Sequence, residues 1–174
     1  KDVGLGIDVN IFDNIQDLEA WMTDCYNITK STKYYTSYCW EWKSKDNSTE
    51  IDIKIPETNP VFQKKWNPKY EQYQWYLDSI DKVGCIYTAQ GLGFDYVGFI
   101  WWEDLVWRTD HWEFNTDLLY DFQLSKSIKN NTNKQDLLLN IYRVMLTRAK
   151  KGIGIWFKDE ETKQHFKKIC LLEG

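Results

Sequence analysis

The stretch from Gly84 to Ile100 constrains the fold of this 174-residue chain more than any other. Cys85 to Tyr87 is predicted as a short buried strand, and Tyr96 to Trp101 as a second apolar strand. The turn from Gln90 to Gly93 between them has two glycines within three residues, which lets the backbone bend sharply and approach a neighbouring group. Ligands in α/β proteins bind at strand ends, so this turn is a better site candidate than any helix. By itself, a Gly-x-Gly turn is more often a simple connection.

Strand and helix patterns alternate along the rest of the chain. Period-2 or apolar runs predict strands, and apolar residues at helical spacing predict helices. Strands are expected at 5–12, 34–42, 50–55 and 153–157, and a hairpin at 105–108 and 112–114. Helices are expected at 13–28, from the polar loop 130–133 to about 150, and after a cap at Asp159. Gly152 and Gly154 are expected to end the second helix and start the last strand. This order predicts a single domain over 1–174 with the α/β fold of a RecA-like lobe, a mostly parallel sheet covered by helices, with an irregular insertion around residues 56–81.

Charge and cysteine content exclude several classes of protein. The net charge of −4 gives no global basic field, so contact with a phosphate backbone requires a local patch. The four cysteines are scattered without a CxxC pair, which indicates reduced thiols in an intracellular protein, cytoplasmic or nuclear, with no disulfide frame and no metal site. The given residues contain no run of 18 apolar residues, and no signal peptide is expected. The chain opens abruptly on a strand, as an excised domain would.

Nucleotide-binding motifs of the usual kind are missing from this chain. A RecA-like ATPase normally carries GxxxxGK[ST] after its first strand, and neither that P-loop nor a convincing acidic Walker B pair is present. The chain alone is therefore expected to bind neither a nucleoside triphosphate nor Mg²⁺, and to show no ATP hydrolysis.

A basic segment closes the second long helix. Four cations lie between Arg143 and Lys151, just before a glycine. Cations at a helix C-terminus complement its dipole, which accounts well for Lys150 and Lys151. This dipole interaction accounts less well for Arg148, because burying half of a guanidinium in an apolar stretch costs free energy unless an anion pairs with it. A guanidinium is suited to gripping a phosphate.

These segments resemble the motifs of superfamily 1 helicases. Thr147 to Lys150 is similar to motif VI, and Gln90 to Leu92 followed by Phe94-Asp95 is similar to motif V, in the right order. More closely, the chain from about Leu5 to Leu171 resembles the C-terminal RecA-like lobe of the Schlafen-type DNA/RNA helicase domain family. The segments that carry this closer resemblance are Tyr38 to Lys43, Val83 to Ile86, Asp95 to Gly98, Asp104-Leu105, Asn140 and Tyr142-Arg143.

The resemblance implies a role for each matching residue. Arg148 would be the catalytic motif VI arginine, reaching across a lobe interface to the γ-phosphate of ATP and neutralising charge during phosphoryl transfer. The residues that would couple to the ATP site are Gln90, Gly91, Thr147 and, by a weak match to motif IV, Lys33; those at nucleic-acid backbone would be Tyr87 and Thr88. ATP and Mg²⁺ would bind only together with an N-terminal RecA-like lobe of the same polypeptide. The other partner would be DNA or RNA, as a single strand, and no membrane is expected.

One departure from the family pattern favours a different function. The family has Glu where this chain has Gly93, so the carboxylate that would hydrogen-bond the nucleotide sugar or order the turn is absent. The serious alternative is therefore a non-catalytic module that binds protein or nucleic acid and retains a degenerate helicase lobe. A nuclease of the PD-(D/E)xK type is less expected, because Asp52-Ile53-Lys54 and Glu41-Trp42-Lys43 match only a short half-motif.

Tryptophans offer a further alternative that the sequence leaves open. Trp101, Trp102 and Trp107 would suit a platform for stacked bases, but aromatics along strands are more often core. Core positions are expected for at least two of the three.

Overall fold

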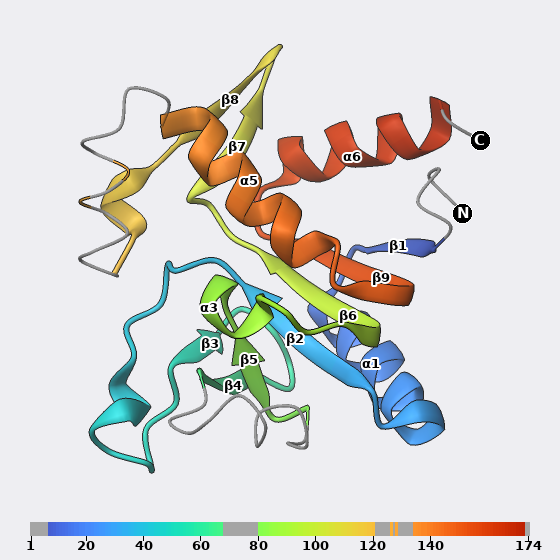
Figure 1. The fold of residues 1–174 in the computed structure, drawn as a ribbon, viewed down its shortest axis with the longest axis vertical. Coiled ribbons are helices and arrows are strands. Elements are labelled where there is room, and N and C mark those ends of the chain that lie inside the picture. Colours follow the sequence, from blue (N-terminus) through green and yellow to red (C-terminus); the bar gives the residue numbers. More distant parts are fainter. Residues whose placement is uncertain (1–6, 68–79, 121–125, 127, 129–133, 173–174) are drawn as a thin grey trace.

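A computed structural model describes residues 7–67, 80–120, 126, 128 and 134–172 (Figure 1). Within them a seven-stranded sheet has the order β1-β9-β6-β2-β5-β4-β3, and its neighbours are parallel except β3, which is antiparallel to β4. The strand bounds are β1 Asp8–Phe12, β2 Thr32–Thr36, β3 Ile53–Ile55, β4 Phe62–Trp66, β5 Lys82–Gly84, β6 Phe94–Trp101 and β9 Ala149–Phe157. The predicted α/β class with a mostly parallel sheet is confirmed.

Helices cover both faces of this sheet. Helix α1 (Ile15–Thr29) packs on one face, and α3 (Ile86–Ala89), α5 (Lys134–Leu146) and α6 (Glu160–Leu172) pack on the other. In Figure 1, α5 crosses the sheet over β6 and β9. The hairpin of β7 (Leu105–Arg108) and β8 (His111–Phe114) extends beyond the sheet, and short 3-10 turns lie at Lys43–Lys45 and Thr116–Leu118. No helix in the described part of the chain has the length and apolar content needed to span a membrane.

Two glycines bring α1 close to the central strands. A Cβ atom on Gly98 of β6 would lie 3.0 Å from Met22 Cγ of α1 and 2.7 Å from the Tyr34 ring of β2, and one on Gly154 of β9 would lie 2.7 Å from the Trp21 ring of α1. Any larger side chain would push the helix away, so these positions require glycine. The prediction that Gly152 and Gly154 end the helix and start the last strand is wrong, because β9 begins at Ala149 and contains both glycines.

Two other strand predictions are also wrong. The run from Cys85 forms helix α3, because Thr88 Oγ1 accepts a 2.8 Å hydrogen bond from the Cys85 amide and so caps a helical turn. The strand that was expected to reach Trp42 ends at Thr36, after which Cys39 and Trp40 are buried by loop packing rather than by strand alternation. Aromatic content alone predicts burial, and it does not separate a strand from a buried loop.

The expected irregular insertion around 56–81 is in part regular. β4 lies inside it and pairs in parallel with β5, with Trp66 opposite Val83. Phe62 and Trp66 are buried on the same face of the sheet as α1, so core packing explains the strand. Residues 68–79 of the predicted insertion fall outside the described residues.

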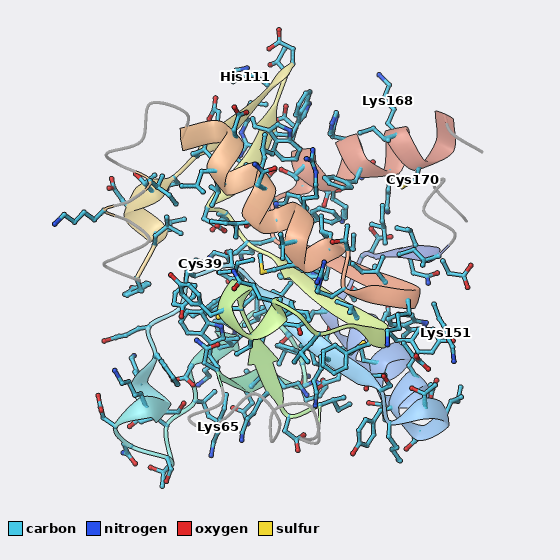
Figure 2. The ribbon with its side chains drawn as sticks, viewed as in Figure 1. Cys39, Lys65, His111, Lys151, Lys168 and Cys170 are labelled. Atoms are coloured by element: carbon cyan, nitrogen blue, oxygen red, sulfur yellow. The ribbon has the colours of Figure 1, made fainter. Side chains whose placement is uncertain are left out.

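Predictions at the C-terminal part of the chain are largely confirmed. The 105–114 hairpin forms, and Asp159 caps α6 by accepting a 2.8 Å hydrogen bond from the Thr162 amide. Arg108 of the hairpin donates two 2.8 Å hydrogen bonds to the same Asp159 carboxylate. His111 lies at the hairpin's far end (Figure 2). All four cysteines are free thiols, as expected.

Candidate functional site

The motif V-like and motif VI-like turns lie against each other. The Phe94 amide donates a 2.9 Å hydrogen bond to the Arg148 carbonyl, and Phe94 and Ala149 are paired in the first register position of β6 and β9. A Cβ atom on Gly93 would lie 3.0 Å from Lys150 Cε and 3.6 Å from the Arg148 carbonyl oxygen. The turn before β6 and the turn before β9 therefore form one continuous surface at the amino ends of the two strands.

Local hydrogen bonds explain why the helix before Arg148 stops. The Thr147 hydroxyl donates to the carbonyls of Arg143 (2.8 Å) and Val144 (3.2 Å), and the Arg148 amide donates to the Met145 carbonyl (3.3 Å). These bonds tighten the last turn of α5 and satisfy carbonyls that the helix end leaves free. The chain then enters β9 directly, which fixes the Arg148 backbone between a helix and a strand.

The Arg148 side chain retains unused donor capacity. Arg148 is half-buried, and its Nη2 donates a 3.2 Å hydrogen bond to Thr147 Oγ1. Its Nε atom is buried and has no hydrogen-bond partner, and no carboxylate in the described part of the chain pairs with the guanidinium. A buried N–H without an acceptor is costly. The arrangement is therefore suited to an anion that approaches from outside the chain.

The neighbouring lysines differ in how they are used. Lys151 Nζ lies 2.7 Å from Asp95 Oδ2, and this contact raises the pKa of the Lys151 ammonium. Lys151 lies at the periphery of the molecule (Figure 2). Lys150 is exposed, lies over Gly93 and has no carboxylate partner among the residues that the structure describes. At this surface, Arg148 and Lys150 are thus the cations that remain for an external anion.

Gln90 and Gly91 lie where the sequence places them, on the exposed loop that leads into this surface. Gly91 has a φ of 74°, a left-handed conformation that glycine adopts without strain, and Gln90 ends α3 in an extended conformation. Lys33 does not reach the surface. It is fully buried in β2, with its Nζ 5.9 Å from the centre of the Phe94 ring, so it lies beneath the turn rather than in it.

The two residues that were expected at nucleic-acid backbone are placed differently. Thr88 uses its hydroxyl within the chain, accepting from the Cys85 amide and donating to the Cys85 carbonyl at 3.1 Å. Tyr87 is 50% exposed, and its ring centre lies 5.4 Å from that of Tyr38 in an edge-to-face arrangement. Tyr87 is therefore half exposed at the surface, whereas Thr88 mainly shapes the helix.

Sequence reasoning missed a buried polar cluster around Asp104. Asp104 is fully buried, and its Oδ1 accepts 2.8 Å hydrogen bonds from the Ser37 hydroxyl and the Tyr142 hydroxyl. Cys39 Sγ lies 3.0 Å from Ser37 Oγ, and Asp104 Oδ2 has no hydrogen-bond partner among the residues that the structure describes. Burial raises the pKa of the Asp104 carboxyl and raises the pKa of the Cys39 thiol well above its usual value. Cys39, Asp104 and Tyr142 all belong to segments that carry the family resemblance, but no spacing in the sequence indicates that they meet.

The half-motif considered for a nuclease is occupied by structural contacts. Asp52 accepts hydrogen bonds of 2.7 Å from the backbone amides of Ser44 and Trp66, so its carboxylate anchors a loop to β4. Glu41 pairs with Lys43 at 3.4 Å on the surface. Within the described ranges no three His, Cys, Asp or Glu side chains gather as a metal site would require.

Comparison with known proteins gives two matches. The family model described as "Schlafen group 3, DNA/RNA helicase domain" matches residues 2–159. The chain is also 31% identical over 164 residues to the uncharacterized protein YPL245W of Saccharomyces cerevisiae, an alignment that covers 85% of this chain and 36% of the yeast protein. The chain thus spans about a third of the length of that relative. No solved structure matches.

Proposed function

This chain belongs to the Schlafen group 3 DNA/RNA helicase domain family, and on that premise we propose that it is the C-terminal motor lobe of an ATP-dependent helicase or translocase. The observation that carries the proposal is the junction of the two turns, which holds Arg148 at a surface with a guanidinium that no carboxylate of the described residues neutralises. The lobe would complete an ATP site whose remaining parts belong to an N-terminal lobe of the same polypeptide.

Each residue at the junction has a defined task in this proposal. Arg148 would approach the γ-phosphate and neutralise the charge that develops on it, while the Thr147 hydroxyl, 3.2 Å from Nη2, orients the guanidinium. The loop at Gln90 and Gly91 would transmit the state of the nucleotide to the bound strand. Lys33 would act only indirectly, by packing under Phe94. ATP with Mg²⁺ would supply the phosphoryl group and be held mainly by the other lobe.

One observation favours a second candidate, the non-catalytic interaction module. Gly93 offers no carboxylate, and the Lys150 side chain lies over the space that the family's Glu would occupy. A site with glycine at this position and a lysine side chain over it can still bind an anion, but it lacks the carboxylate that would accept a hydrogen bond from a sugar hydroxyl.

ATP turnover separates the two candidates. A polypeptide that contains this chain and its N-terminal lobe should hydrolyse ATP, with stimulation by single-stranded DNA or RNA, whereas the 174-residue chain alone should not. A two-lobe polypeptide that binds nucleic acid without any turnover would favour the interaction module. Turnover by the 174-residue chain alone would contradict both.

A further inference from the structure

A cavity of about 540 Å³ lies beside the β7–β8 hairpin, and we call it the hairpin cavity. Its lining combines apolar side chains with carboxylates. Val106 is buried, Phe114 and Leu118 are half-buried, and Glu103 and Glu113 are exposed. Cavities of this size, apolar with a few polar or charged groups, are where proteins bind small molecules or single side chains of a partner. The hairpin cavity is therefore suited to a ligand that is partly apolar and partly charged.

The charge that the hairpin cavity presents to a ligand is negative. The basic residue in its lining, Arg108, already donates two 2.8 Å hydrogen bonds to the Asp159 carboxylate. Glu103 has no ion pair among the residues that the structure describes. Glu113 lies 3.4 Å from His111 Nε2, and both of these side chains are more than half exposed, so this pair is weak. A cation can therefore approach either glutamate without displacing a strong partner.

The strand beside the hairpin cavity has an unpaired edge. Within the described ranges, β8 pairs with no strand other than β7. The outer edge of β7 is already used, because the Trp107 amide donates a 2.9 Å hydrogen bond to Thr162 Oγ1 of α6. Figure 1 shows the hairpin extending beyond the sheet, with β8 on its side away from α6. An unpaired strand edge can add an extended peptide, whose backbone provides affinity and whose side chains enter adjacent pockets.

We propose that the hairpin cavity binds a lysine or arginine side chain of an extended protein segment that pairs with the edge of β8. The cationic group would lie at Glu103 and Glu113, and its methylene stem would cover the apolar part of the lining. A free amine has the same charge and stem, but it cannot pair with a strand edge, which favours a polypeptide. Arg148 lies at the amino ends of β6 and β9, whereas the hairpin follows the carboxyl end of β6, so this docking site is separate from the proposed ATP site.

A short peptide tests the proposal on the 174-residue chain. The probe is an acetylated heptapeptide with a central lysine and alternating threonine and valine on both sides. Its control carries norleucine in place of lysine, which keeps the apolar stem and removes the charge. In titrations followed by amide NMR, the lysine peptide should shift the amides of Glu113 and Phe114 and leave that of Arg148 unchanged. It should bind about tenfold more tightly than the norleucine peptide, as two exposed ion pairs would give, and added salt should reduce the difference.

Variants of the two glutamates test which groups hold the cation. Glu103→Gln and Glu113→Gln should each weaken binding of the lysine peptide by about two- to fivefold, the scale of an exposed ion pair, and together by about tenfold. Glu50→Gln is the matched control, because it removes the same charge from an exposed glutamate in the loop before β3, at the other end of the molecule from the hairpin (Figure 1). Glu50→Gln should bind the lysine peptide like the wild type.

Three results would each overturn the proposal: equal affinity for the lysine and norleucine peptides, unchanged affinity in the double glutamate variant, or no measurable peptide binding. Spermidine that binds as tightly as the lysine peptide and shifts the same amides would overturn the choice of a polypeptide as the ligand. None of these results depends on ATP turnover in a two-lobe polypeptide, which tests the motor-lobe proposal.

Discussion

The Phe94 amide donates its hydrogen bond to the backbone carbonyl of Arg148, so the two motif-like turns are joined through main chain and not through the arginine side chain. Because the acceptor is a main-chain carbonyl, this hydrogen bond is retained in any Arg148 variant whose backbone keeps its conformation. The guanidinium is therefore dispensable for the fold while its position is fixed by the fold. This separation allows stability and function to be tested independently.

Arg148→Ala should leave the isolated chain almost as stable as the wild type. The guanidinium contributes one hydrogen bond, to the neighbouring Thr147, and has no carboxylate partner in the described residues. The free energy of unfolding in urea should change by less than about 1 kcal/mol. Cooperative loss of the fold in Arg148→Ala would show instead that this side chain is structural.

Gly93→Glu should be tolerated, although it restores the family's carboxylate. The atom nearest to an added Cβ is Lys150 Cε, at 3.0 Å, near the end of a flexible side chain that can move. We expect a change in unfolding free energy within about 1 kcal/mol. Gly98→Ala is the control, because its Cβ would meet the Tyr34 ring at 2.7 Å in the core and should cost about 1–3 kcal/mol. Equal damage from both substitutions would contradict the open geometry at Gly93.

Asp104 should make stability depend on pH. Burial raises its pKa above the unfolded value, so its protonated form is favoured in the folded chain. Its contribution is then fully present below the unfolded pKa of about 3.9 and is lost as the pH rises through the folded pKa. Urea unfolding at a series of pH values should show this fall for the wild type, and Asp104→Asn should remove it. Asp46→Asn, at an exposed position, should keep the wild-type profile; a profile unaffected by Asp104→Asn would refute the assignment.

Arg108 should stabilise the docking of the β7–β8 hairpin on α6. Its two guanidinium nitrogens each lie 2.8 Å from one oxygen of Asp159, a bidentate geometry that lysine cannot reproduce. Arg108→Lys should therefore cost about 1 kcal/mol and Arg108→Ala about 1–2 kcal/mol of unfolding free energy. The measurement is urea unfolding, and two variants of wild-type stability would show that the pair contributes nothing.

The sequence predicted those parts of the fold that depend on local pattern. β1, α1, the hairpin and the cap at Asp159 all follow from periodicity or capping within a few residues. Predictions failed where tertiary contacts overrode pattern, as at Gly154, which lies inside β9 where Trp21 and Leu18 of α1 pack closely against it. The run after Cys85 failed for a different reason, because a threonine hydroxyl caps a helical turn there.

The candidate site was predictable only as far as motifs identify residues. The motifs indicated Arg148 and Gln90. The spacing of the motifs along the sequence does not indicate that Lys33 is buried beneath Phe94. Asp104 and Tyr142 are 38 residues apart, and their hydrogen bond depends on how α5 packs on β6. Contacts of this kind arise from the assembled sheet, so no local reading of the chain finds them.

ATP turnover by a polypeptide that contains both lobes, compared between the wild type and Arg148→Ala, tests whether Arg148 acts on the phosphate of ATP. Arg143→Ala is the matched control, since this exposed arginine lies on α5, the helix that precedes Arg148, and its side chain donates only to Asn140 at 3.3 Å among the described residues. Arg148→Ala should lower turnover by about 10³-fold or more, the scale of an arginine finger, while Arg143→Ala should retain most of it. Normal turnover in Arg148→Ala, or an equal loss in Arg143→Ala, would contradict the assignment of Arg148 as an arginine finger.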